Sequence, residues 1–110
     1  MTGNNSENTS NWTFLSNYSH VLLCLAQDNT MIMREIALKV GITERAVQQI
    51  IADLAESGYI DRIKVGRSNR YIIHMDRHLR HPIEGKCLIR NLIKLILKGE
   101  CLNTKEPEIK

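Results

Sequence analysis

The stretch that decides the fold is MREIALKVGITERAVQQIIADLAESGYI, residues 33–60. Its apolar side chains recur at helical spacing in two runs, residues 34–40 and residues 44–57. A glycine follows each run, and glycine accepts the left-handed backbone conformation that ends a helix. Only Gly41-Ile42-Thr43 separates the two runs, and Thr43 is a good N-cap for the second. The stretch therefore predicts two helices that cross steeply at a tight turn.

The segments on either side of this stretch predict a hairpin and a further helix. After Gly58 the spacing of the apolar residues changes from helical to every second position. This pattern predicts strands at 59–65 and 70–74 around a turn at 66–69. Upstream, Ser16 has N-cap chemistry for a helix that runs to about Gln27. Turn residues follow it, and residues 31–33 are expected to form a small strand.

Residues 83–98 are predicted to be a last helix with an unusually large apolar surface. Seven large aliphatic side chains lie between Leu88 and Leu97, more than one stripe facing a small core would hold. One alternative is that this helix packs on the first helix of its own chain. We expect instead that it packs against a second copy of the chain through six residues, Leu88, Ile89, Leu92, Ile93, Leu95 and Ile96.

The length of 110 residues leaves room for one domain. Residues 1–11 are polar apart from Met1, so we expect a flexible arm there and a flexible tail at 99–110. The folded domain is expected over residues 12–82, with 83–98 added to it. Trp12 and Phe14 could join a dimer contact or cover the domain, and of these two we expect them to cover the core.

The charge is unevenly distributed along the chain, although the formal net charge is only +3. Ten Lys and Arg lie between Arg62 and Lys98 against two acids, whereas residues 1–61 carry three basic and seven acidic side chains. A basic half joined to an acidic half favours a polyanionic partner. The alternative is a solvated surface that is merely uneven in charge.

The segment from Met33 to Ile60, with the hairpin after it, resembles the core of winged helix-turn-helix transcriptional regulators of bacteria and archaea, of the MarR-like and ArsR-like groups. The resemblance covers about residues 15–75. It implies an α+β fold that is mostly α, with a three-helix core and a β-hairpin wing, to which we expect residues 83–98 to add a C-terminal dimerisation helix. It also implies a homodimeric, sequence-specific regulator that binds double-stranded DNA, with repression as the expected effect on transcription.

The helix over residues 43–57 is the expected recognition helix for the major groove. Its outward side chains include Arg45, which can present a fork to guanine, and two glutamines, which can pair with adenine. An ordinary solvated helix surface is the alternative. The expected contacts with DNA are Thr43, Glu44, Arg45, Gln48 and Gln49.

The hairpin has a basic tip that suits phosphate contact or insertion into a narrow minor groove. Protection of the sheet edge by charged side chains is the alternative use of these residues. The expected DNA contacts of the wing are Arg62, Lys64, Arg67, Ser68, Asn69 and Arg70.

We expect neither an enzyme, a metal site nor a cofactor. The sequence has no glycine-rich phosphate loop and no Ser/His/Asp arrangement. His78, His81 and Cys87 lie close in sequence, but their spacing matches no closed zinc pattern. The three scattered cysteines (Cys24, Cys87, Cys101) are expected to be reduced thiols in a cytoplasm, with Cys24 in the core.

We also expect no membrane partner, because no apolar run approaches the ~18 residues of a membrane span and no secretory signal precedes Trp12. An unknown small-molecule effector is a further partner that the sequence allows. The rival function is a winged-helix module that binds RNA or a protein without operator specificity. The polar character of the expected recognition face disfavours a protein partner.

Overall fold

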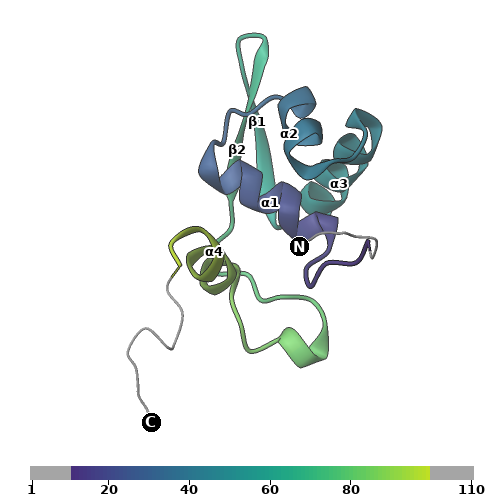
Figure 1. The fold of residues 1–110 in the computed structure, drawn as a ribbon. Helices are drawn as coiled ribbons and strands as arrows, with labels where there is room; N and C mark the ends of the chain where they lie inside the picture. Colours follow the sequence, from purple (N-terminus) through teal and green to yellow (C-terminus); the bar gives the residue numbers. More distant parts are fainter. Residues whose placement is uncertain (1–10, 100–110) are drawn as a thin grey trace.

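The computed structural model describes residues 11–99. Figure 1 shows helices α1 (Asn17–Gln27), α2 (Met33–Val40) and α3 (Glu44–Glu56) grouped beside a two-stranded hairpin, with α4 (Ile89–Leu97) at the opposite end from the hairpin tip. A short 3-10 helix, Pro82–Glu84, lies in the connector between the hairpin and α4. Cys101, residues 1–10 of the expected arm and residues 100–110 of the expected tail lie outside the described residues. The expected winged-helix fold, mostly helical with one antiparallel hairpin, is confirmed.

The turn between α2 and α3 is closed as the sequence predicts. Gly41 has φ of 85°, and the backbone N–H groups of Gly41 and Ile42 both donate to the Ala37 carbonyl, at 2.8 and 3.1 Å. Thr43 then caps α3 with its side chain. At the other end of α3, Gly58 has φ of 84° and the Tyr59 N–H donates to the Leu54 carbonyl at 2.9 Å. The predicted bounds of both helices are therefore correct to within one or two residues.

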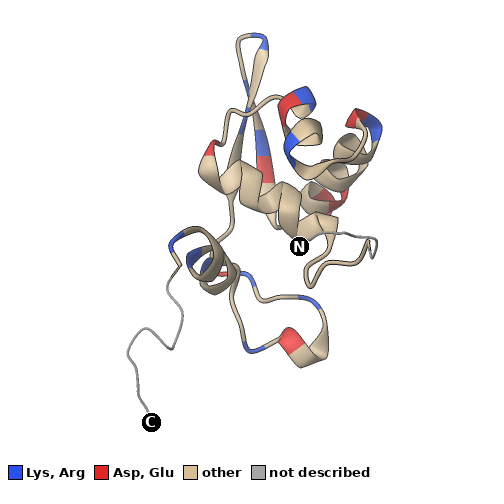
Figure 2. Ribbon diagram, in the orientation of Figure 1, with Lys and Arg blue, Asp and Glu red and all other residues tan. Residues whose placement is uncertain are grey.

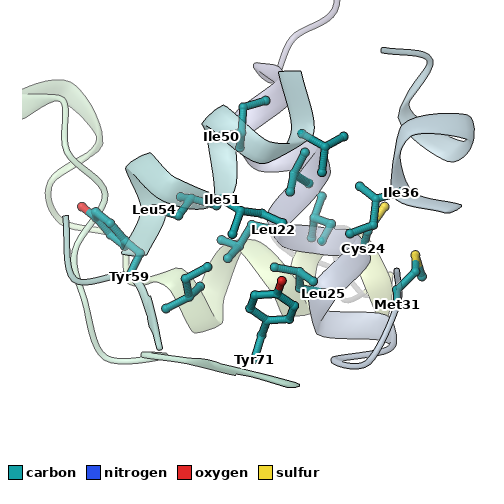
Figure 3. Close-up of a cluster of buried hydrophobic side chains, with 14 of the residues drawn as sticks. Leu22, Cys24, Leu25, Met31, Ile36, Ile50, Ile51, Leu54, Tyr59 and Tyr71 are labelled. Atoms are coloured by element: carbon teal, nitrogen blue, oxygen red, sulfur yellow. The ribbon is translucent and has the colours of Figure 1, made fainter. Parts of the chain in front are cut away.

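The core lies where α1, α2 and α3 meet the inner face of the hairpin. Leu25, Ile36, Ile51 and Ile60 are fully buried, one from each element in turn. Figure 3 shows Leu25, Ile51 and Tyr71 directed into this common interior. Cys24 is buried beside them, and burial raises the pKa of its thiol. The expected place of Cys24 in the core is confirmed.

The hairpin consists of β1 (Ile60–Val65) and β2 (Ser68–Ile73), which pair antiparallel from Ile60 opposite Ile73 to Val65 opposite Ser68. The turn contains only Gly66, with φ of 64°, and Arg67. The predicted four-residue turn was wrong in its second half, because Ser68 and Asn69 continue the ladder. A two-residue turn suits the twist of paired strands and lets the pairing run to the tip.

The small strand predicted at residues 31–33 was also wrong, because Met33 already begins α2. One residue of the turn before it, Asn29, pairs with β2. The Tyr71 N–H donates to the Asn29 carbonyl at 3.0 Å, and the Asn29 side-chain amide donates to the Tyr71 carbonyl at 3.1 Å. These two bonds fasten the base of the hairpin to the turn after α1.

The last helix begins at Ile89, six residues later than predicted. Residues before it are tied into the connector instead: the Leu79 N–H donates to the Cys87 carbonyl and the Ile89 N–H to the Arg77 carbonyl, at 3.0 and 2.8 Å. The Asn91 side chain accepts from the Leu88 N–H at 2.8 Å and so caps the shorter helix. Sequence spacing gave no sign of these long-range bonds.

Trp12 and Phe14 do not cover the core, and that expectation was wrong. Their side chains are 69 % and 92 % exposed, and the two rings meet edge to face at 5.1 Å between centroids. Ser16, in contrast, stands at the N-cap of α1 as predicted, although its hydroxyl makes no capping bond. Its backbone carbonyl accepts from Ser19 and His20.

Candidate nucleic-acid interface

The outward side of α3 is a polar surface, which we call the reading face and define by Thr43, Glu44, Arg45, Gln48 and Gln49. All five residues are exposed. The opposite side of the helix carries the buried apolar residues Val47, Ile50, Ile51 and Leu54. Because residues three and four apart share a side of a helix, Arg45 and Gln49 lie in one outward row. The predicted recognition residues are therefore accessible to a partner.

Thr43 holds the first turn of α3. Its Oγ1 accepts a hydrogen bond from the Ala46 N–H at 3.0 Å. The hydroxyl proton is then free to be donated outward, because a hydroxyl can accept and donate together. The positive end of the helix dipole lies at the same place, which favours an anion such as a phosphate.

A hydrogen-bond network that sequence reasoning missed adjoins the reading face. The Gln49 amide nitrogen donates to one carboxylate oxygen of Asp53 at 3.0 Å, and the Tyr18 hydroxyl donates to the other at 2.5 Å. The bond to Asp53 raises the pKa of Tyr18 above its ordinary value. The spacing of Gln49 and Asp53 along the helix hints at the first contact, but Tyr18 is 35 positions away from Asp53.

The basic residues of the wing divide between its two faces. Arg62 lies opposite Tyr71 and Lys64 opposite Asn69, so these residues share the face that turns toward the core. Arg70 lies opposite Ile63, and Ser68 opposite Val65, on the outer face. Arg67 occupies the turn between them. The structure thus does not gather the four cations on one surface but surrounds the tip with them.

The wing residues are available to a partner: Arg62, Lys64, Arg67, Ser68 and Arg70 are exposed, and Asn69 is half-buried. In Figure 2 the basic hairpin tip and the first turn of α3 lie on the side of the molecule away from α4. Nearer the base of the hairpin, Asp61 is 3.0 Å from the His74 ring, so the negative charge of the wing lies away from its tip.

Two arginines of the connector bind the C-terminal end of α3 and do not contribute to the surface formed by the reading face and the wing. The Arg77 guanidinium donates to the Ser57 carbonyl at 3.0 Å and lies 5.3 Å from the centre of the Tyr59 ring. Arg80 is 3.4 Å from the Ser57 hydroxyl. Cations at the C-terminal end of a helix satisfy its free carbonyls and favour its dipole. They fasten the connector to α3.

The residues expected to form a dimer contact fall into three groups. Ile89 and Ile93 are buried within the protomer, where α4 packs on α1. Leu88 and Leu92 are half-buried. Leu95 and Ile96 are each 45 % exposed. One side of α4 thus packs on α1 of the same chain, which was the alternative to a dimer contact. The other side remains accessible.

The histidines of the connector serve its local structure. The His78 ring donates through Nδ1 to the Gly85 carbonyl at 2.7 Å, and His81 Nδ1 accepts from the Ile83 N–H at 3.1 Å. Among residues 11–99, no three His, Cys, Asp or Glu side chains come together as a metal ion would require. No helix in this same part of the chain is long and apolar enough to cross a membrane.

A cavity of about 310 Å³ lies between α1, α3, the connector and α4. Its lining includes the apolar side chains of Leu22, Leu54 and Leu79 together with Tyr18 and Arg80. The cavity therefore borders the same Tyr18 that contacts Asp53 on α3.

Comparison with known families agrees with this geometry. Residues 19–61 match the family described as winged helix-turn-helix DNA-binding. The match runs from the first turns of α1 into β1 and includes the whole reading face. No curated protein shows a significant match to the chain.

Proposed function

We propose, from the premise that this chain carries a winged helix-turn-helix DNA-binding domain, that it is a homodimeric repressor that recognises a specific sequence of double-stranded DNA. The observation that carries the proposal is the exposed, polar reading face of α3 beside a wing with cations around its tip. A DNA partner would also explain why the basic residues are concentrated in the second half of the chain, and this function requires no catalytic group.

The reading face suits base recognition in the major groove. A helix fits that groove, and its first turns reach the base edges. Arg45 would offer a bidentate contact to guanine, and Gln48 or Gln49 a contact to adenine. Thr43 would contact a backbone phosphate with its free hydroxyl proton, and Glu44 would accept from cytosine.

The wing would supply affinity that does not depend on sequence. Arg67 lies in the turn, flanked by cations on both faces of the hairpin. Such an arrangement can contact phosphates on both sides of the tip or place an arginine in a narrow minor groove. Ser68 and Asn69 would add neutral hydrogen bonds to phosphate oxygens.

The exposed side of α4 would form the dimer contact. Leu95 and Ile96 are aliphatic, and their exposure to water is unfavourable by roughly 25 cal/mol per Å² of apolar surface. A two-fold contact through α4 would present two reading faces to successive half-sites of a near-palindrome. A bound dimer would repress by blocking access of polymerase to a promoter.

The rival partners are RNA and protein. The reading face is polar throughout, whereas a protein-binding helix typically exposes an apolar row. The major groove of RNA helices is too deep and narrow for side chains to read, which favours DNA for this face. Competition between duplex DNA and folded RNA at equal ionic strength distinguishes the two nucleic acids.

A cytoplasmic location would agree with the proposed DNA partner. The effector that the sequence allows would suit the cavity beside α3, because its volume reaches the lower end of the range for small-molecule sites and most of its wall is apolar.

Selection of bound fragments from a random duplex pool tests the main proposal. We expect one preferred sequence with two similar halves. Arg45→Ala should change which sequence is preferred, because it removes a base contact. The control Arg67→Ala should weaken binding to preferred and scrambled duplexes alike. Equal losses on both duplexes for Arg45→Ala would contradict base reading, and the absence of any duplex binding at low salt would refute the proposal.

A further inference from the structure

Asp53 and Tyr18 form a hydrogen-bond network with Gln49 at the edge of the reading face, and these two residues have no role in the proposal above. We propose that Asp53, held by Tyr18, is a positioning residue that fixes the orientation of the Gln49 amide and so sets the base preferred at one position of the half-site. This inference rests on the proposed function and assigns the determinant of specificity within it.

The orientation follows from the chemistry of the groups. An ionised carboxylate only accepts hydrogen bonds, so the amide nitrogen of Gln49 must face Asp53 and the amide oxygen must face away. The oxygen and the second N–H of the same nitrogen then remain for a base. Adenine requires both, because its N6 amino group donates and its N7 accepts.

Tyr18 makes this arrangement rigid. On α3 alone, an Asp four residues after a Gln forms a weak pair of a few tenths of a kcal/mol. Here the second carboxylate oxygen accepts from a hydroxyl of α1, the helix whose other side is buried in the core. A tyrosine hydroxyl, with an ordinary pKa of about 10, is protonated and can donate across the neutral range. The bond to Asp53 raises the pKa of Tyr18 further in the same direction. An amide held in place before binding loses less conformational freedom when it meets its base.

The effect of the Asp53 charge on DNA binding can be separated by experiment from the effect of its hydrogen bonds. An acid on this helix repels phosphates, so its removal strengthens binding to any duplex. Glu56 is an exposed acid three positions further along α3 and has no hydrogen bond to Gln49. Substitution of Glu56 by Ala therefore removes the same charge as Asp53→Ala but leaves the Gln49 amide held by Asp53.

The experiment measures binding to the selected duplex and to duplexes with each other base at every position of one half-site. Gln49→Ala identifies the position that Gln49 reads. We expect Asp53→Ala and Tyr18→Phe to reduce discrimination at that position on the order of tenfold and to leave the other positions unchanged. Tyr18→Phe should have no further effect in the Gln49→Ala background.

Two controls match these variants. Glu56→Ala should strengthen binding to all duplexes without changing any preference. Tyr59→Phe should leave every preference intact, because it removes a comparable hydroxyl bond, 2.7 Å long, to the His78 carbonyl. Thermal unfolding confirms that each variant is folded.

The inference is overturned if Asp53→Ala and Tyr18→Phe keep full discrimination at that position or reduce it at all positions alike. That result is distinct from failure of the proposed function, in which the wild-type protein itself discriminates at no position.

Discussion

At Gly41 the chain passes from α2 into α3 with a backbone conformation that favours glycine. The left-handed region costs an L-residue with a side chain roughly 1–2 kcal/mol, because its Cβ approaches the following carbonyl. The steep crossing of α2 and α3, and hence the exposure of the reading face, depends on this residue.

Gly41→Ala should lower the free energy of unfolding by about 1–2 kcal/mol. Apart from Gly41 and its two neighbours in the chain, no heavy atom lies within 4 Å of the position that its Cβ would take, so the loss comes from the local backbone alone. Urea unfolding of the variant and the wild-type protein measures this loss in the free energy of unfolding. Gly85→Ala is the control, since Gly85 has φ of −64° and its added Cβ would make an ordinary contact at 3.5 Å. A loss as large in the control would show that strain at Gly41 is not the cause.

Among the elements, the wing is the one whose proposed contribution to DNA binding we expect to depend most on ionic strength. Its ladder continues to the two-residue turn, so Arg67 is carried at the end of a regular hairpin and not in an irregular loop. If about three to five cations of one subunit contact phosphate, log K should fall against log salt with a slope near −3 to −4.5.

Arg67→Ala should make that slope shallower by about 0.9, because one phosphate contact and its released counterion are lost. Titrations at several salt concentrations on one duplex measure the change. Arg77→Ala is a useful contrast: its guanidinium bonds to the Ser57 carbonyl, so we expect lower stability but the same slope. A slope that Arg67→Ala leaves unaltered would remove the wing tip from the phosphate interface.

For the whole molecule, the proposal to test is that a second copy of the chain covers the exposed side of α4, which carries Leu95 and Ile96. Removal of residues 83–110 is a poor test, because it also takes Ile89 and Ile93 out of the core of the protomer. Loss of a buried Ile typically costs about 2–5 kcal/mol, enough to unfold a small domain. Substitution of the exposed side alone avoids this loss.

The double variant Leu95→Glu and Ile96→Glu should therefore sediment as a folded monomer. Its affinity for a two-half-site duplex should fall on the order of 100-fold, since binding to the second half-site is no longer linked to the first. Ile83→Glu is the control, an exposed aliphatic residue of the connector. Sedimentation as a dimer by the double variant would place the contact elsewhere or exclude it.

Local rules were sufficient for the elements that depend on neighbouring residues. The turn at Gly41, the cap at Thr43 and the end of α3 at Gly58 each rest on contacts a few positions apart, and all were predictable. The exposure of the expected recognition residues was predictable as well, because helical spacing decides which side of α3 is buried.

Features that rest on contacts between distant segments were not predictable. Asn29 takes the place of a strand only because β2 passes beside it, and α4 starts late because the connector binds residues 87–89. The bond from Tyr18 to Asp53 joins two helices that sequence spacing cannot bring into register. The exposed Trp12 and Phe14 show that large apolar side chains do not by themselves predict burial.

The two hydrogen bonds between Asn29 and Tyr71 divide the hairpin into two halves. The half near the helices is held by these bonds, and the half that carries the turn extends beyond them. Up to the pair Arg62 and Tyr71 the strands are clamped to the helices, and past it they extend for only three residue pairs and a turn. We expect bending of the hairpin to be confined to these last three pairs and the turn. If the wing contacts DNA as proposed, its tip would adjust to the width of a groove by small deflections while α3 keeps its own alignment.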